Sequence, residues 1–184
     1  MGKRILKGVI VLLVLLLIGG VFIYKRTTTG DINAFQQNVD AAAHNLQSDR
    51  ESLKIEDFTA EMIKTNEKPM IIVMGESWCQ PCLKMIPDLR ELSVSVDDIT
   101  IKYLDLEKNP EAFNVFPIRV TPTIAVYLEN GVPFTPPEGS AIDYILYTYK
   151  DTGEHAITIH EGMLTRSQLE MMIEDIRNAD GRDS

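Results

Sequence analysis

The sequence predicts an α/β fold with a central mixed sheet, preceded by one N-terminal transmembrane helix. Three observations lead to this prediction. Short apolar segments alternate with segments of helical periodicity from residue 55 onward. An Asn130-Gly131 pair marks a turn between antiparallel strands. A long uncharged apolar run lies near the beginning of the chain.

This apolar run, residues 8–24, is rich in Leu, Val and Ile. As a helix it would extend about 26 Å, near the lower limit for crossing a bilayer. Lys3, Arg4 and Lys7 precede the run, so the positive-inside tendency favours a cytoplasmic N-terminus and a globular part outside. A cleaved signal peptide has a similar charged start, but no Ala-x-Ala-like site follows the run. We therefore expect a retained single-pass anchor in the cell membrane.

Charge is distributed unevenly along the chain. Residues 1–26 carry five of the 18 basic residues and none of the 27 acidic ones, which leaves 13 basic and 27 acidic residues in the remainder. Such an acidic surface is repelled by nucleic acid and by anionic lipid, so no nucleic-acid partner is expected. About 130 residues are enough for one ordinary core, and the chain shows no internal repeat.

Residues 27–53 are expected to form a helical spacer. Thr27-Thr28-Thr29-Gly30 interrupts the helical pattern, Asp31 can cap a new helix, and apolar residues recur at helical spacing from Ile32 to Leu46. The chain is therefore divided into a cytoplasmic stub and anchor (1–26), this spacer (27–53) and one α/β domain (54–184).

The elements of the domain follow from periodicity and from terminating residues. A helix is expected from Ile55 to Asn66, after which Pro69 precedes a buried strand. The last helix has Thr165 as its cap, with Gln168 completing a capping box. The other expected elements are, in order, the strand Met70–Met74, the helix Cys79–Val94, the strand Thr100–Leu104, the short helix Asn109–Phe116 and the strand Thr123–Leu128.

Residues 132–160 predict an inserted hairpin. A proline-rich loop precedes two strands, 141–149 and 155–160, and Asp151-Thr152-Gly153-Glu154 forms the turn between them. Three tyrosines, Tyr144, Tyr147 and Tyr149, are expected on one face of this hairpin. Two interpretations of them stay open: a recognition surface for a partner protein, or ordinary sheet packing.

Cys79 and Cys82 are the only cysteines in the chain, and an apolar strand leads to them. At this spacing a disulfide can close within the first turn of a helix, yet so short a loop stabilises the fold very little, which favours a redox role. The alternatives are two core cysteines or half of a zinc site. Zinc needs three or four ligands, and His44, His155 and His160 are scattered, so no metal site is expected.

The residues around the cysteines indicate how the site would work. Cys79, at a helix N-terminus, is the expected nucleophile because unpaired backbone amides favour its thiolate, and Cys82 would resolve the intermediate. Pro81 would shape the helix opening. Gln80 is neutral, so it should lower the Cys79 pKa less than a histidine at this position would. Trp78 is expected to pack over the dithiol or to join the core. Glu76 is the nearest carboxylate in sequence.

Several motifs together resemble the thioredoxin superfamily. Trp78-Cys79-Gln80-Pro81-Cys82 resembles its active site, Pro87 stands where that family kinks its active-site helix, and Thr121-Pro122-Thr123 resembles its cis-proline loop. Further matches, in the same order, are Asn109-Pro110, Asn130-Gly131 and Gly162. The resemblance covers Lys54 to Arg177 and implies a three-layer thioredoxin-like fold. With the apolar run, the chain is similar to membrane-anchored, extracytoplasmic thioredoxin-like proteins of bacteria.

The resemblance implies a cis bond before Pro122, which would bring the Thr121 backbone beside Cys79 to bind an extended substrate segment. The alternative is a trans proline that opens a strand. Two positions depart from the family. The place of its buried acid is Val73, and the place of its frequent lysine partner is Tyr103. The usual proton shuttle is therefore missing.

The expected function is a membrane-tethered protein thiol–disulfide oxidoreductase with no cofactor besides the Cys79–Cys82 disulfide. The first hypothesis is a reductase of exported proteins that takes electrons from a transmembrane carrier. The second is an extracytoplasmic thiol oxidase or isomerase. A third is a non-catalytic adaptor in an envelope complex, against which the intact dithiol argues.

Overall fold

The computed structural model of the protein describes Leu16 and residues 53–179. The chain divides into two units, 1–47 and 48–184, and the second contains the α/β domain. Apart from Leu16, the expected anchor over residues 8–24 lies outside the described residues, as does most of the helical spacer (27–53), so both stay predictions. Among the residues that are described, no helix is long and apolar enough to cross a membrane.

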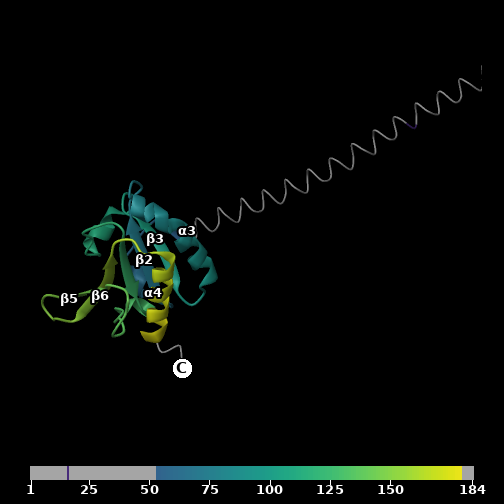
Figure 1. The fold of residues 1–184 in the computed structure, drawn as a ribbon. Coiled ribbons are helices and arrows are strands. Elements are labelled where there is room, and N and C mark those ends of the chain that lie inside the picture. Colours follow the sequence, from purple (N-terminus) through teal and green to yellow (C-terminus); the bar gives the residue numbers. More distant parts are fainter. Residues whose placement is uncertain (1–15, 17–52, 180–184) are drawn as a thin grey trace, which may run out of the picture. The chain divides into compact units, whose positions relative to one another are not determined.

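The domain is built on one six-stranded mixed sheet, which confirms the predicted fold class (Figure 1). The strands lie in the order β1-β3-β2-β4-β6-β5. The pairs β1–β3 and β2–β3 are parallel, whereas β2–β4, β4–β6 and β5–β6 are antiparallel. The strands are β1 (Lys54–Ile55), β2 (Met70–Gly75), β3 (Thr100–Asp105), β4 (Thr123–Tyr127), β5 (Ile145–Thr148) and β6 (His155–Glu161).

Helices cover both faces of this sheet, so the core has two parts. On one face α3 (Gln80–Ser95) and α4 (Arg166–Ala179) pack on Ile71 and Val73 of β2. On the other face α2 (Glu61–Lys64) and the 3-10 helix η1 (Pro110–Asn114) pack on Met70, Ile72 and Met74. Every residue of β2 is buried because both of its faces are covered, and this explains its uninterrupted apolar sequence.

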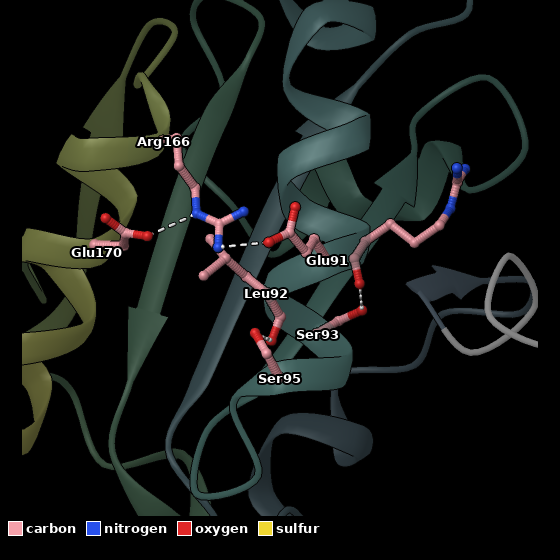
Figure 2. A network of polar contacts seen from close by, with 7 residues as sticks. Glu91, Leu92, Ser93, Ser95, Arg166 and Glu170 are labelled. Atoms are coloured by element: carbon pink, nitrogen blue, oxygen red, sulfur yellow. Dashed lines mark hydrogen bonds and ion pairs between the residues drawn. The ribbon is translucent and has the colours of Figure 1, made fainter.

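Arginines of α4 connect that helix to its neighbours on the same face. Figure 2 shows Arg166 between two carboxylates: its Nε lies 2.7 Å from Glu170 Oε1 and its Nη2 lies 3.1 Å from Glu91 Oε1 of α3. Hydrogen bonds to both carboxylates raise the pKa of Arg166. Arg177 pairs with Asp98, which follows α3, at 2.8 Å. These pairs orient α4 beside α3 more than they stabilise the fold, because surface ion pairs contribute at most about 1 kcal/mol each.

Most of the predicted elements occur within two residues of their predicted bounds. This holds for β2, α3, β3, β4 and η1, although η1 is a 3-10 helix. The capping box of α4 is also confirmed, because Gln168 N donates to Thr165 Oγ1 at 3.4 Å and Thr165 N donates to Gln168 Oε1 at 3.0 Å.

The helix predicted from Ile55 to Asn66 is wrong over its first half. Lys54 and Ile55 form the edge strand β1, paired with Tyr103 and Leu104, and helix begins only at Glu61. The backbone N–H of Phe58 donates to Asn109 Oδ1 at 2.9 Å instead of entering a helix. Apolar residues at helical spacing are thus buried here by a strand and a turn, a tertiary effect that local periodicity does not reveal.

The Asn130-Gly131 turn exists, but the next strand along the chain, β5, pairs with β6 and not with β4. Asn130 and Gly131 have φ of 58° and 73°, and Leu128 N donates to Val132 O at 2.7 Å. Only one isolated bridge follows, between Tyr127 and Pro133, because proline has no N–H for a ladder. The antiparallel neighbours of β4 are β2 and β6.

The predicted hairpin forms from β5 and β6, which project from the rest of the sheet (Figure 1). Its first strand begins at Ile145, four residues later than expected. The tyrosines do not share a face. Tyr144 precedes β5 and packs edge-on against Phe134 at 5.3 Å, with its hydroxyl 3.1 Å from Asp175 Oδ2, whereas Tyr147 contacts the core of the opposite face and Tyr149 is exposed. The expectation that the three tyrosines share one face is therefore wrong.

Replacing Asn109 with alanine is expected to lower the free energy of unfolding by about 2 kcal/mol. Asn109 is 1% exposed, accepts from Phe58 N, and donates through Nδ2 to Asp105 O at 3.0 Å. Its loss leaves the buried Phe58 N–H without its partner. Urea unfolding of the purified chain, followed by circular dichroism, measures the change. Asn114→Ala, at an exposed position of η1, is the control and should stay within about 0.5 kcal/mol of the wild type.

Candidate active site

The two cysteines form a disulfide at the N-terminus of α3, with their Cα atoms 5.2 Å apart. β2 ends at Gly75, and a four-residue turn follows in which Cys79 N donates to Glu76 O at 3.1 Å. Cys79 is the N-cap of α3, and its Sγ accepts a hydrogen bond from Cys82 N at 3.2 Å. The first sulfur therefore takes the place that a capping oxygen has in other helices, among the unpaired amides of the first turn.

Both cysteines are buried, but not equally. Cys79 is 3% exposed and Cys82 is 0% exposed, and both belong to the core on the α3 side of the sheet. Gln80 and Pro81 are exposed at the first two positions of α3. Proline is tolerated at this place because its missing N–H would have no partner within the helix. The order predicted from sequence, with Cys82 deeper than Cys79, agrees with these exposures.

Trp78 lies on the surface with 65% of its area exposed, so the interpretation as a core residue is wrong. The turn between β2 and α3 directs this side chain outward, where it lines a groove with Glu76 and Thr121. A tryptophan kept this exposed beside a disulfide is available to a binding partner.

The loop before β4 lies against the same groove. The Thr121–Pro122 bond is cis, as predicted. Pro122 O accepts a hydrogen bond from Gly162 N at 2.8 Å, and Thr123 Oγ1 donates to Val120 O at 2.7 Å. Thr121 Oγ1 donates to Glu76 Oε2 at 3.2 Å, so the turn before Cys79 and the cis-proline loop are joined directly.

The groove has a volume of about 330 Å³ and contains residues that the sequence analysis did not single out. Half of its lining is apolar and partly exposed, and one cation, Arg119, stands at its edge with its Nε 2.8 Å from Glu161 Oε1. For Ile118, Arg119 and Val120 the only sequence signal is their position just before Thr121, and Phe113 comes from η1. The lining residues are Glu76, Trp78, Phe113, Ile118, Arg119, Val120 and Thr121.

Gly75 and Tyr103 lie on the buried side of the disulfide. A Cβ atom on Gly75 would lie 2.6 Å from Tyr103 Oη and 2.7 Å from Cys82 Sγ. Such contacts are too short for any real side chain, so glycine at this position is what allows the phenol and the sulfur to approach each other. No sequence motif indicates that Gly75 belongs to the site. Tyr103 was noted only as a departure from the family pattern.

Burial, together with the negative charges of Asp105, Glu76 and Glu107, raises the pKa of Tyr103 to about 12. Glu107 in turn accepts a hydrogen bond from Ser77 N at 2.8 Å, and hydrogen bonds from the Ser77 side chain and backbone lower the pKa of Glu107. Three carboxylates therefore surround the site, whereas the sequence indicated only Glu76.

The two histidines that the structure describes lie apart from the dithiol. His160 Nδ1 is 2.9 Å from Asp143 O, and His155 Nε2 is 2.9 Å from Thr158 Oγ1. Within residues 53–179 no three His, Cys, Asp or Glu side chains gather as metal ligands would. The chemistry that this arrangement supports is that of the two sulfurs.

Comparison with known proteins gives a consistent result. Residues 50–143 match the family model described as thioredoxin. Thioredoxin Y of Oryza sativa is 34% identical over 74 residues, which cover 40% of this chain and 44% of that protein. Thioredoxin Y1 of Arabidopsis thaliana is 25% identical over 122 residues, 65% of this chain and 69% of that protein. The chain thus spans less than half of the first relative's length.

Among solved structures, the oxidised form of mitochondrial thioredoxin 3 from Saccharomyces cerevisiae is 22% identical, with a TM-score of 0.47. The alignment covers 70% of this chain and 98% of the yeast chain.

Alkaline pH is expected to destabilise the domain partly through Tyr103. Its folded pKa of about 12 exceeds the value of about 10 in an unfolded chain, so the unfolded state loses the phenolic proton first. The corresponding stability is present below pH 10 and is lost as the pH rises to 12. Between pH 10 and pH 12 the free energy of unfolding should fall by about 2 kcal/mol less in Tyr103→Phe than in the wild-type protein. Urea unfolding at several pH values measures it, and parallel curves for the two proteins would contradict the assignment.

Proposed function

Because the chain belongs to the thioredoxin family, we propose that it is a protein thiol–disulfide oxidoreductase whose reacting groups are Cys79 and Cys82. One observation carries this proposal: the two sulfurs form a disulfide at the opening of α3, next to a cis-proline loop and an open apolar groove. The groove provides access for a protein segment, and the helix end provides the charge stabilisation that a thiolate needs.

In the reducing direction the reaction begins with both cysteines reduced. The Cys79 thiolate attacks one sulfur of a substrate disulfide, a mixed disulfide forms, and the second substrate sulfur leaves as a thiolate. The electron pair of Cys82 then forms a bond with Cys79 Sγ, and the bond from Cys79 to the substrate breaks. The substrate gains two electrons and two protons, and the protein is left with the disulfide that the structure contains.

Supporting residues have separate tasks in this proposal. Pro81 shapes the helix opening. Gln80 has a neutral side chain, so the backbone amides at the helix N-terminus, and not a charge on residue 80, lower the pKa of Cys79. Trp78 contributes apolar contact area in the groove. Thr121, held by Glu76 at 3.2 Å, offers its backbone to an extended substrate segment beside the cis proline.

The reducing direction requires a dithiol donor to regenerate the site. A transmembrane electron carrier with a dithiol of its own is the proposed donor, because the anchor expected over residues 8–24 would hold both proteins in one membrane. Disulfides of exported proteins are the proposed substrates. These assignments rest on the apolar run and its preceding basic residues, which favour an extracytoplasmic domain.

Cys79→Ser is expected to abolish reduction of a protein disulfide, because the attacking sulfur is gone. Cys82→Ala should retain the first step and accumulate the mixed disulfide between Cys79 and its substrate. Turbidity of insulin during reduction by dithiothreitol measures the activity, and non-reducing electrophoresis of cell extracts detects the mixed disulfide. Ser77→Ala, next to the site but without a reacting atom, is the matched control and should keep its activity.

An active Cys79→Ser variant would exclude the enzymatic mechanism and leave the adaptor hypothesis. The redox state in living cells determines the direction. Rapid alkylation that finds the pair mostly reduced would support a reductase, and a mostly bridged pair would favour an oxidase.

Removal of residues 1–26 is expected to release the protein from bacterial membranes that retain the full chain after alkaline carbonate extraction. Protease added to intact spheroplasts should degrade the domain of the full chain if it lies outside, while a cytoplasmic control protein survives. Full-length protein in the soluble fraction would refute the anchor.

A further inference from the structure

Tyr103 places a hydroxyl group beside the deeper of the two sulfurs. It lies in β3, pairs with Val73 of β2, and its side chain enters the core on the α3 side. Both its Oη and Cys82 Sγ lie less than 3 Å from the place that a side chain on Gly75 would fill, at 2.6 and 2.7 Å. The phenol and the sulfur thus face one small space.

This space is where charge must appear during the reaction. For Cys82 to attack Cys79, its thiol has to lose a proton while it is 0% exposed. Burial disfavours the thiolate, and the neighbouring Val73 has no polar atom to offset that effect. Glu76, Asp105 and Glu107 act on the same region with negative charge, which opposes ionisation further.

We propose that the Tyr103 hydroxyl donates a hydrogen bond to the Cys82 thiolate in the reduced protein and thereby makes the resolving step possible. This inference rests on the proposed function. In that step the Cys82 proton passes to solvent, the Cys82 electron pair forms the bond to Cys79 Sγ, and the departing substrate thiolate takes up a proton from solvent. Tyr103 keeps its own proton throughout.

The environment of the phenol suits a permanent donor rather than a base. Burial and the nearby carboxylates raise its pKa to about 12, so the phenol keeps its proton at neutral pH. A hydrogen bond to a charged acceptor is among the stronger polar interactions in proteins. Gly75 is needed for this arrangement, because any side chain at position 75 would separate the Tyr103 hydroxyl from Cys82 Sγ.

The test measures Cys82 directly. In the full chain carrying Cys79→Ser, Cys82 is the only thiol, and its ¹³Cβ chemical shift is followed against pH. Adding Tyr103→Phe is expected to raise the Cys82 pKa by about one to two units, the shift that corresponds to loss of a hydrogen bond to a charged group. Tyr127→Phe is the matched control: Tyr127 is 7% exposed but packs on the opposite face of the sheet, so the Cys82 pKa should not change.

Kinetics of the intact dithiol give a second readout. With Tyr103→Phe, resolution of a preformed mixed disulfide at pH 7 should slow about tenfold per pKa unit, while the attack of Cys79 on a small aromatic disulfide keeps its rate. An unchanged Cys82 pKa in Tyr103→Phe overturns the inference, and so does an equal shift in Tyr127→Phe. If Tyr103→Phe does not fold, the ¹³Cζ chemical shift of Tyr103 in the Cys79→Ser protein replaces it: this shift should change at the pH at which Cys82 ionises, and a shift that stays constant there overturns the inference.

The titration needs no substrate, so it separates this inference from the proposed function. A wild-type protein that fails to reduce insulin refutes the function whatever the Cys82 pKa. A wild-type protein that reduces insulin, together with a Cys82 pKa that Tyr103→Phe leaves unchanged, refutes only the role of Tyr103.

Discussion

The position of the dithiol depends on how β2 ends. The strand is buried along its whole length between β3 and β4, so its last residue, Gly75, is fixed in the middle of the sheet. The following turn places Cys79 where its sulfur caps α3. Buried packing of α3 against the sheet then directs Cys82 inward. The chemistry of the site is therefore determined by the rigid centre of the fold, and only the groove beside it is formed by loops.

The sequence predicted the parts whose stability is local or whose pattern is strong. β2 is a continuous apolar run, α3 opens with Cys-x-Pro-Cys, and α4 has a capping box, so each was recognisable alone. Ile55 and Phe58 were misassigned because partners 49 to 51 positions away, Leu104 and Asn109, determine their structure. The same limit applies to the site: the approach of Tyr103 to Cys82 depends on pairing between β2 and β3 and on the missing side chain of Gly75.

The two sulfurs differ both in their electrostatic environment and in their access to a protein partner. Cys79 lies among helix amides and next to a groove, which favours ionisation and contact with a protein partner. Cys82 lies in the core, near carboxylates that act on Tyr103. In the proposed mechanism this asymmetry divides the work: the outer sulfur would meet the substrate, and the inner sulfur would react only after the outer one has formed the mixed disulfide.

β5 is an edge strand of the sheet, and among the described residues only β6 pairs with it, which affects how copies of the molecule can associate. Unpaired strand edges are templates for sheet extension between molecules, which leads to aggregation. β5 offers only four residues, and its register with β6 shifts between Tyr147 and Thr148. Short length and a local irregularity are both means by which natural sheets discourage edge-to-edge association. The hairpin can thus widen the domain without offering a long, regular strand edge to neighbouring molecules.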